Sequence, residues 1–235
     1  MLCIENMSVT RGVGEQGFTV SLPTLHLADG EVLAIQGTSG CGKSTLLEMI
    51  GLILQPDQLR SFQFGNGDTL LDIQPFIQQQ NQHVLAKIRA EKLGFMLQNG
   101  GLLPFLTVAQ NIRLPNALLQ TPIDHAWVAL LCQELNIDHL LAKYPKQLSI
   151  GERQRVAFIR AVAHKPLLLL ADEPTSALDP YHADILFGLI LELVVQQHIS
   201  VLLVTHDWEL VKRRQLRTLQ ANLLSPQQAI FTDIC

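Results

Sequence analysis

Short apolar runs alternate with stretches of helical periodicity along this chain. The apolar runs lie at 31–35, 93–97, 167–171 and 200–205, and each has the length of one buried strand. Apolar positions at helical spacing occupy about 43–54, 107–162 and 183–197. Strands that alternate with helices predict an α/β fold with a mainly parallel sheet.

Other segments interrupt this pattern. The stretch 55–67 contains proline and glycine, and we interpret it as loop and edge strands. Segment 74–82 holds five glutamines, which favours a solvated helix or a linker. Pro115, Pro122 and Pro145 punctuate the helical middle of the chain. We expect that middle to form an inserted helical subdomain.

The composition is apolar but contains no candidate membrane span. Hydrophobic residues make up 48% of the chain and charged residues 16%, which argues against disorder. Mean hydropathy is +0.22. A membrane span needs roughly 20 apolar residues, whereas the densest apolar run, 167–171, is followed at once by two acids. The apolar excess therefore suits a sheet buried on both faces, together with an apolar partner surface.

Charge and cysteine usage exclude several other classes of protein. The net charge is −4 and there is no block of Lys and Arg, which argues against nucleic acid as a partner. The short basic cluster at 212–214 is interpreted as a solvated helix face. Residues 1–9 lack the layout of a signal peptide. The four cysteines are scattered, so they suggest neither a zinc site nor a disulfide framework and fit a reducing cytoplasm.

The segment 37–44 matches the phosphate-binding pattern G-x4-G-K-S. Glycines let the backbone turn its N–H groups toward phosphate oxygens, and the helix that follows adds its positive end. Lys43 is expected to reach the β- and γ-phosphates of ATP, and Ser44 to bind Mg²⁺. An ordinary glycine-rich turn is disfavoured because the match follows a strand and opens a helix. The predicted nucleotide-binding residues here are Gly37, Thr38, Ser39, Gly40, Cys41, Gly42, Lys43, Ser44 and Thr45.

Two acids end the apolar run at 167–171. Ligands of parallel α/β sheets lie beyond the carboxyl ends of the strands, which would bring Asp172 beside the phosphate loop as a ligand of Mg²⁺. Glu173, one residue further on, is a candidate general base for the attacking water. The alternative is that both acids merely face solvent.

Further motifs resemble those of the ATP-binding-cassette family. Residues 148–155, Leu-Ser-Ile-Gly-Glu-Arg-Gln-Arg, are similar to the family's signature motif, usually LSGGQ. Gln98, 176–179 and 205–207 complete the ordered set, and the resemblance runs from about 30 to 207. It implies an ATPase subunit that dimerises, as a homodimer, around two ATP–Mg²⁺ and drives separate integral membrane transporter subunits. Such a subunit would be cytoplasmic, peripheral on the inner face of the cell membrane.

The resemblance also implies roles for single residues. Gln98 matches the glutamine that contacts Mg²⁺ or the attacking water. Ser149 and Gly151 match residues that clasp the γ-phosphate bound to the opposite subunit. Asp179 matches a loop that communicates across the dimer, and His206 matches a histidine that contacts the γ-phosphate.

The family's fold is a phosphate-loop NTPase core with a mainly parallel sheet, an N-terminal antiparallel β portion and an inserted helical subdomain. On this chain it implies a core lobe at 1–93 and 163–235, and a helical lobe that carries the signature motif at 94–162. Residues 88–98, 102–107 and Asn111 resemble the lipoprotein-release, macrolide-efflux and cell-division group, whereas 173–179 is similar to small-molecule importers; we favour the first group.

Three positions depart from the family pattern. Ile150 stands where glycine is usual, so its β-branched side chain would disfavour positive φ and add bulk near phosphate. Glu152 replaces the usual glutamine. Arg11 stands where an aromatic residue normally stacks on adenine, and Phe18 is an alternative, so the adenine platform stays open.

The membrane partner has one candidate docking surface, the segment 98–106, where apolar side chains concentrate. The alternative is that these side chains fill the junction between the lobes. A cassette that transmits force without transport is a second functional hypothesis. A DNA-repair or translation ATPase is disfavoured because coiled-coil inserts, tandem cassettes and basic arms are missing from the sequence.

Overall fold

The computed structural model describes residues 1–12, 14, 17–66, 69–98, 100–176 and 178–234. The strands are β1 (Leu2–Arg11), β2 (Phe18–Leu27), β3 (Val32–Gln36), β4 (Ser61–Asn66), β5 (Thr69–Asp72), β6 (Leu93–Met96), β7 (Leu168–Asp172), β8 (Ser200–Val204), β9 (Arg217–Ser225) and β10 (Gln228–Ile234). The helices are α1 (Lys43–Ile50), α2 (Gln74–Gln78), α3 (Gln82–Lys92), α4 (Val108–Leu119), α5 (His125–Glu134), α6 (Ile150–Val162), α7 (Pro180–Gln197) and α8 (Trp208–Arg213), with short 3₁₀ turns η2 (Asp138–Leu140) and η3 (Pro145–Gln147).

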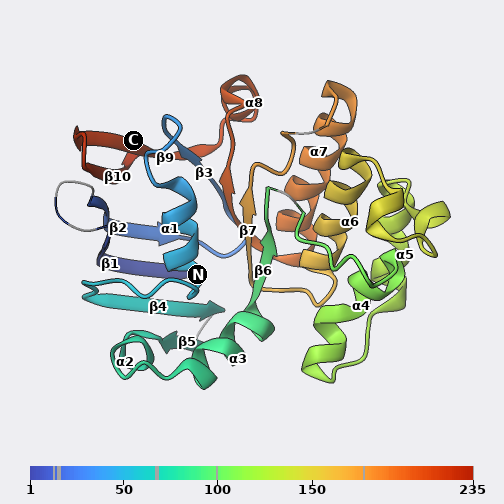
Figure 1. Ribbon diagram of the computed structural model, residues 1–235, viewed down its shortest axis with the longest axis horizontal. Helices are drawn as coiled ribbons and strands as arrows, with labels where there is room; N and C mark the ends of the chain where they lie inside the picture. The colour runs from blue at the N-terminus through green and yellow to red at the C-terminus, as the bar shows by residue number, and fades with distance from the viewer. Residues whose placement is uncertain (13, 15–16, 67–68, 99, 177, 235) are drawn as a thin grey trace.

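The strands form one curled sheet in the order β5-β4-β1-β2-β10-β9-β3-β8-β7-β6 (Figure 1). From β9 to β6 every neighbouring pair is parallel. The N-terminal part is antiparallel, through the pairs β1–β2, β1–β4 and β4–β5. This arrangement confirms the predicted fold class. The segment 55–67, predicted to hold edge strands, contains β4, which is the second strand from the edge because β5 pairs with its outer side.

The parallel strands bury both of their faces. Along β7, Leu168 and Leu170 join one hydrophobic cluster, which includes the buried residues of α1. Leu169 and Ala171 alternate with them and join a second cluster, formed with α4 to α7. Figure 1 shows α1 on the left of the molecule and α4 to α7 gathered on the right. The high hydropathy of the sequence is therefore explained by a sheet covered on two sides.

Two predicted helix boundaries were wrong. The first helix was expected to run to residue 54, but α1 ends at Ile50. Leu52 takes a left-handed conformation with φ 59°, and the N–H groups of Ile53 and Leu54 both donate to the Glu48 carbonyl, which closes the helix. Pro115 was expected to interrupt the helical middle, but it lies inside α4. Packing of α4 overrides the loss of one backbone hydrogen bond there.

The glutamine-rich segment 74–82 contains the short helix α2, a turn, and the first residue of α3. Ile77 is buried, while Gln78, Gln79 and Gln80 are exposed or nearly so. The segment is therefore a solvated helix and turn anchored by one apolar side chain, in agreement with the interpretation of the sequence.

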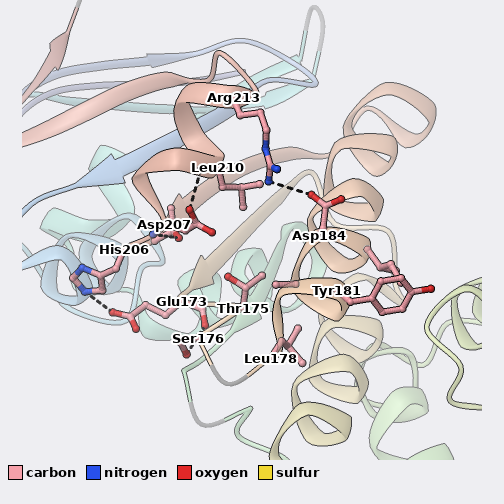
Figure 2. Close-up of a pocket in the computed structure, with 13 residues that line it drawn as sticks. Glu173, Thr175, Ser176, Leu178, Tyr181, Asp184, His206, Asp207, Leu210 and Arg213 are labelled. Atoms are coloured by element: carbon pink, nitrogen blue, oxygen red, sulfur yellow. Dashed lines mark hydrogen bonds and ion pairs between the residues drawn. The ribbon is translucent and has the colours of Figure 1, made fainter.

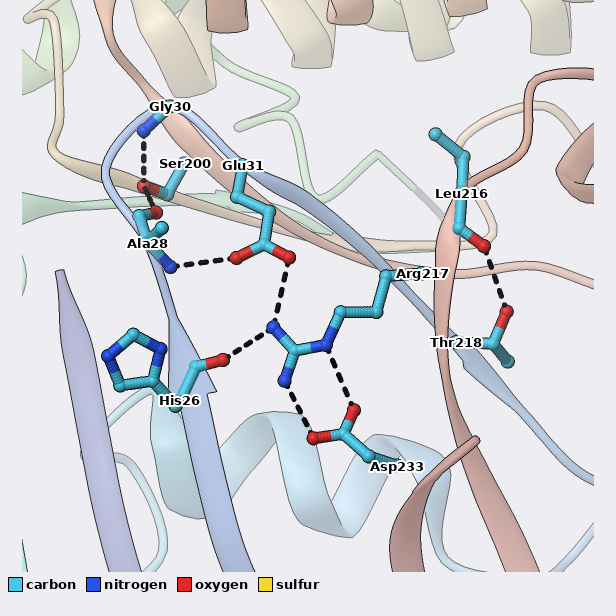
Figure 3. A network of polar contacts seen from close by, with 9 residues as sticks. All are labelled: His26, Ala28, Gly30, Glu31, Ser200, Leu216, Arg217, Thr218 and Asp233. Carbon is cyan, nitrogen blue, oxygen red and sulfur yellow. Dashed lines mark hydrogen bonds and ion pairs between the residues drawn. The ribbon is translucent and has the colours of Figure 1, made fainter. Parts of the chain in front are cut away.

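Arg217 on β9 ties the C-terminal hairpin to the rest of the sheet (Figure 3). Its guanidinium forms two hydrogen bonds with the Asp233 carboxylate, with Nε–Oδ1 3.2 Å and Nη2–Oδ2 2.6 Å. Nη1 donates to Glu31 Oε1 at 2.9 Å and to the His26 carbonyl at 2.7 Å. The hydrogen bond with Asp233 is the main cause that raises the pKa of Arg217. A planar guanidinium suits such a bidentate contact.

We expect Arg217→Ala to lower the free energy of unfolding by about 2 kcal/mol, because hydrogen bonds to charged groups contribute about 1.5–3 kcal/mol. Urea denaturation followed by circular dichroism measures this change. The matched control is Arg60→Ala, which removes an ion pair with Glu5 whose two side chains are 74% and 51% exposed. That pair should contribute less than about 1 kcal/mol. Equal losses in the two variants would contradict the anchoring role of Arg217.

Candidate active site

The phosphate loop lies between β3 and α1, and two of its positions accept only glycine. A Cβ at Gly37 would lie 2.5 Å from the Cys41 Sγ and 2.6 Å from the Ala221 Cβ. Gly42 has a φ of 93°, and a Cβ there would lie 2.4 Å from the Val20 Cγ2. The loop therefore packs tightly on its own thiol and on strands β2 and β9.

The tip of this loop is open, whereas its lysine is folded underneath. Thr38, Ser39 and Gly40 are exposed and Thr45 is partly exposed. Lys43 is buried, and its Nζ donates to the carbonyls of Gly37 and Thr38, both at 2.9 Å. The ammonium group thus lies within the loop that the sequence predicted to hold phosphate.

Cys41 contributes its backbone rather than its side chain. Its thiol is 2% exposed and belongs to the hydrophobic cluster that also contains α1. Its N–H donates to the Thr38 carbonyl at 3.4 Å, which is a long hydrogen bond. A phosphate could therefore meet the backbone at this position but not the sulfur.

Ser44 and Asp172 connect the phosphate loop to the end of β7. Ser44 Oγ donates to Asp172 Oδ2 at 2.9 Å, although the residues are 128 positions apart in the sequence. Hydroxyl and carboxylate oxygens are the ligand type that Mg²⁺ prefers. These two residues therefore fit a magnesium site of the kind that the sequence predicted.

Glu173 is the meeting point of three loops. Its Oε2 accepts a hydrogen bond from Gln98 Nε2 at 3.2 Å, and its Oε1 lies 2.9 Å from His206 Nε2. Gln98 follows β6, Glu173 follows β7 and His206 follows β8, so the three side chains come from the carboxyl ends of adjacent parallel strands. The structure brings together all three residues that were predicted to be catalytic.

The backbone of Glu173 is strained and held in place. Its φ is 50°, a left-handed value that costs a non-glycine residue about 1–3 kcal/mol. Its N–H donates to the Val204 carbonyl at 2.9 Å, and its own carbonyl accepts from the N–H and Oγ of Ser176. These contacts keep the carboxylate turned toward Gln98 and His206.

A cavity of about 610 Å³ opens beside Glu173 and His206 (Figure 2). Its walls are the segment after β7, the first turns of α7, and α8. Arg213 on α8 and Asp184 on α7 face each other across it at 3.4 Å. None of residues 37–45 lines this cavity, so the space extends away from the phosphate loop of the same chain.

Asp179 caps the start of α7. Its Oδ1 accepts hydrogen bonds from the N–H groups of Tyr181 and His182, and its Oδ2 lies 2.6 Å from His182 Nδ1. The hydrogen bond from the His182 side chain is the main cause that lowers the pKa of Asp179. Ala177, two positions earlier in the same motif, lies outside the described residues.

The signature motif forms the start of α6. Ser149 is the N-cap, its Oγ accepts from the Glu152 N–H at 3.2 Å, and Glu152 Oε2 accepts from the Ser149 N–H at 2.6 Å. This reciprocal capping box is the main cause that lowers the pKa of Glu152. Ile150 is the first residue of the helix and its side chain is 58% exposed, so the expected conflict with a positive φ does not arise.

The structure does not bring Ser149 and Gly151 to the phosphate loop. Both lie at the start of α6, in the half of the molecule away from α1 (Figure 1). Within one chain, the signature motif and the phosphate loop are therefore separate sites.

The two candidates for the adenine platform are neighbours. Arg11 and Phe18 pair across β1 and β2, next to the phosphate loop. Arg11 Nη1 contacts Glu48 Oε2 on α1 at 3.0 Å. Phe18 packs under Gly42, with its Cε1 3.5 Å from the place of a Cβ. The geometry keeps both candidates open.

Arg160 near the site had no signal in the sequence. Its guanidinium donates to the carbonyls of Gly100 and Gly101, at 2.8 and 2.7 Å. Burial lowers the pKa of this arginine. One arginine within a helix is usually a solvated residue, so only the fold reveals this contact.

Comparison with known proteins decides the family. A model of the ABC transporter family matches residues 21–176, which is more than half of the chain. The chain belongs to the ABC transporter family. This cassette also shares its fold with solved structures. The dimeric post-hydrolysis state of the ATP-binding cassette MJ0796, bound to ADP and Pi, is 29% identical, with a TM-score of 0.82 over 97% of this chain and 96% of that chain.

Two further structures agree. The dimeric structure of MJ0796 described as a bacterial ABC transporter cassette is 30% identical, with a TM-score of 0.81 over 94% of each chain. A chain from a structure described as an inward-facing metal-chelate type ABC transporter is 26% identical, with a TM-score of 0.69 over 99% of this cassette and 82% of that chain. The family assignment and the fold predicted from the sequence are confirmed, and the cassette is a nucleotide-binding ATPase.

The segment expected to dock a membrane partner is only partly exposed. Phe105 is 70% exposed and Leu97 is 51% exposed. Phe95 and Leu102 are partly buried and pack against the two hydrophobic clusters of the cassette. Across the described residues, none of the helices combines the length and the apolar character needed to cross a bilayer.

We expect Gly42→Ala to weaken ATP binding at least about tenfold, because left-handed strain of about 1–3 kcal/mol adds to the overlap with Val20. The thermal midpoint without nucleotide should also fall. Isothermal titration calorimetry and thermal unfolding measure the two effects.

Gly40→Ala is the matched control, since Gly40 has a φ of 79° but open space where its Cβ would lie. Its thermal midpoint should fall less than that of Gly42→Ala. In a Val20→Ala background, Gly42→Ala should lose less ATP affinity than it does alone. Wild-type affinity of the Gly42→Ala variant would show that the loop tolerates the side chain.

Proposed function

We propose that this chain is the ATP-hydrolysing subunit of an ABC transporter, which forms a homodimer around two ATP–Mg²⁺ and drives separate integral membrane subunits. The observation that carries the proposal is the convergence of Gln98 and His206 on Glu173, next to a phosphate loop joined to Asp172. The signature motif lies at the start of α6, apart from the phosphate loop of the same chain, and this separation supports a site completed by a second copy.

In this proposal, the backbone of Gly37 to Thr45 receives the phosphates of ATP at the start of α1. Lys43 exchanges its two carbonyl acceptors for oxygens of the β- and γ-phosphates. Ser44, Asp172 and Gln98 hold Mg²⁺, which supplies positive charge to the phosphate oxygens. The contact of Ser44 with Asp172, and of Gln98 with the adjacent residue Glu173, supports this assignment.

Glu173 acts as the general base in hydrolysis. A carboxylate has about four lone-pair sites, so the contacts with Gln98 and His206 leave room to accept a proton from water. The strained backbone fixes the direction of the carboxylate before substrate arrives. His206 holds one of its oxygens and contacts the γ-phosphate.

The second subunit supplies Ser149 and Gly151 to the γ-phosphate. Both residues sit at the start of α6, where backbone N–H groups and the helix dipole favour an anion. The cassette MJ0796, which is similar over nearly the whole chain, is itself dimeric. Asp179 belongs to the motif that begins at Ser176, which bonds to the Glu173 carbonyl, and it is proposed to face the partner subunit.

The membrane partner docks on the helical side of the cassette. We assign the core lobe to 1–93 and 163–235 and the helical lobe to 94–162. Leu97 directly precedes Gln98, and Phe105 follows it further along the same segment. Both side chains are exposed and offer apolar contact area. This placement puts the cassette on the inner face of the cell membrane, bound through its partner, and a complex of the lipoprotein-release or macrolide-efflux type fits best.

We expect Glu173→Gln to bind ATP as wild type does but to hydrolyse it at least about a hundredfold more slowly, because a positioned general base contributes about 10²–10⁴-fold. Slow hydrolysis should trap a dimer with ATP, which light scattering coupled to size exclusion measures. Lys43→Ala is the control that removes ATP binding itself. A Glu173→Gln protein that binds ATP and stays monomeric, with its membrane partner present, would refute the dimer.

The same trapped dimer tests the signature motif. Adding Ser149→Arg to Glu173→Gln should abolish the dimer, because the new side chain fills the anion site at the start of α6. ATP binding by the monomer should survive, since the phosphate loop is unchanged. A dimer that persists in this double variant would exclude the role proposed for Ser149.

A further inference from the structure

A partly buried arginine joins the signature helix to the loop that carries Gln98. Arg160 lies in the third turn of α6, the helix that begins at Ser149. Its Nη1 donates to the Gly101 carbonyl at 2.7 Å and its Nη2 to the Gly100 carbonyl at 2.8 Å. The partners are 59 and 60 residues away in the sequence, so the contact fixes two distant segments against each other.

The contact is unusual in its acceptors. Among the described residues, no carboxylate lies within ion-pair distance of Arg160, so the two carbonyls are its hydrogen-bond partners. Two N–H groups of one planar guanidinium reach two successive carbonyls, which a lysine ammonium cannot match in geometry. The guanidinium of Arg160 therefore binds the loop that contains Gly100 and Gly101.

That loop is a closed turn around Gln98. The Gly100 N–H donates to the Leu97 carbonyl at 2.8 Å, which places Gln98 within the turn. On the other side of the turn, Gln98 Nε2 donates to Glu173 Oε2. The arginine therefore holds the backbone of a turn whose side chain reaches the candidate general base.

Strand β6, which leads into the turn, is also pressed against α6. A Cβ at Gly94 would lie 2.3 Å from the Ala161 carbonyl, so the strand and the helix are in close contact. Gly94 and Ala161 fix the start of this segment, whereas Arg160 fixes its end. Gly100 also packs against α6, since a Cβ there would lie 3.4 Å from the Ala157 Cβ and from the Arg153 carbonyl. Arg160 adds the side-chain hydrogen bonds that hold the end of the segment on the helix.

We propose that Arg160 is a positioning residue for Gln98. Through Arg160, the position of Gln98 relative to Glu173 depends on the position of helix α6, which begins at the signature motif. The inference rests on the proposed role of Gln98 in hydrolysis. In this proposal, Arg160 itself contacts neither the nucleotide nor the attacking water. It acts through the two glycine carbonyls, and its effect requires the Gln98 side chain.

A double-mutant cycle between Arg160 and Gln98 tests this inference. The variants are Arg160→Gln, Gln98→Ala and the double variant, assayed as full chains for steady-state ATP hydrolysis and for equilibrium ATP binding. We expect Arg160→Gln to lower kcat about tenfold, as expected for the loss of one charge-assisted contact at a reaction site. ATP affinity should stay within about twofold, because the phosphate loop is unchanged. In the Gln98→Ala background, Arg160→Gln should change kcat less than about twofold.

Two further variants separate positioning from stability. Arg160→Lys keeps the charge but loses the paired contact, so it should lower kcat in the same background-dependent way; it replaces Arg160→Gln in the cycle if that variant does not fold. Arg89→Lys is the matched control, since Arg89 Nη1 donates to the Leu52 carbonyl at 2.6 Å, away from the Gln98 turn. It should lower the thermal midpoint without lowering kcat.

The outcomes are distinct. If Gln98→Ala lowers kcat and Arg160→Gln lowers it by the same factor with and without Gln98, Arg160 does not act through Gln98 and the inference is wrong. If Gln98→Ala leaves kcat at the wild-type value, the proposed role of Gln98 is wrong and the inference falls with it. A kcat of Arg89→Lys reduced as much as that of Arg160→Lys would show a general effect of stability.

Discussion

The parallel pairing of β3, β8, β7 and β6 decides where the polar groups of this cassette lie. Every one of these strands is apolar on both faces, so polar side chains can follow them only at their ends. Because the strands are parallel, their carboxyl ends share one edge of the sheet. The phosphate loop, Glu173, His206 and the Gln98 turn all begin at that edge, and the chemistry of the site follows from this constraint.

The edge of the sheet determines which loops lie near the site, and local contacts determine the positions of the side chains within them. Glu173 keeps a left-handed backbone because Val204 at the end of β8 accepts from its N–H and Ser176 after β7 donates to its carbonyl. Ser44 reaches Asp172 because α1 starts where β3 ends. The site is thus assembled by backbone hydrogen bonds that fix Glu173 and by side-chain contacts that join Ser44 to Asp172 and join Gln98 and His206 to Glu173. This is the kind of preorganisation that lets dipoles act on a reaction without rearranging first.

The sequence predicts those parts of the structure that depend on local pattern. The phosphate loop could be found because the close packing around Gly37 and Gly42 requires glycine at both positions, and their spacing is part of a known sequence pattern. The acids after β7 could be found because they directly follow an apolar strand. Contacts between distant segments that no motif marks could not be predicted. Pro115 stays helical through the packing of α4, Cys41 turns inward under the loop, and Arg160 is ordinary until the fold brings the Gln98 turn to it.

The hydrogen bonds of Lys43 to its own loop have a consequence for the turnover of the cassette. A buried ammonium without acceptors would carry a large desolvation penalty. Here the carbonyls of Gly37 and Thr38 solvate the charge from within. In the proposed function, phosphate oxygens would replace these two carbonyls as the acceptors of the Lys43 ammonium, so its charge would keep hydrogen-bond partners throughout turnover.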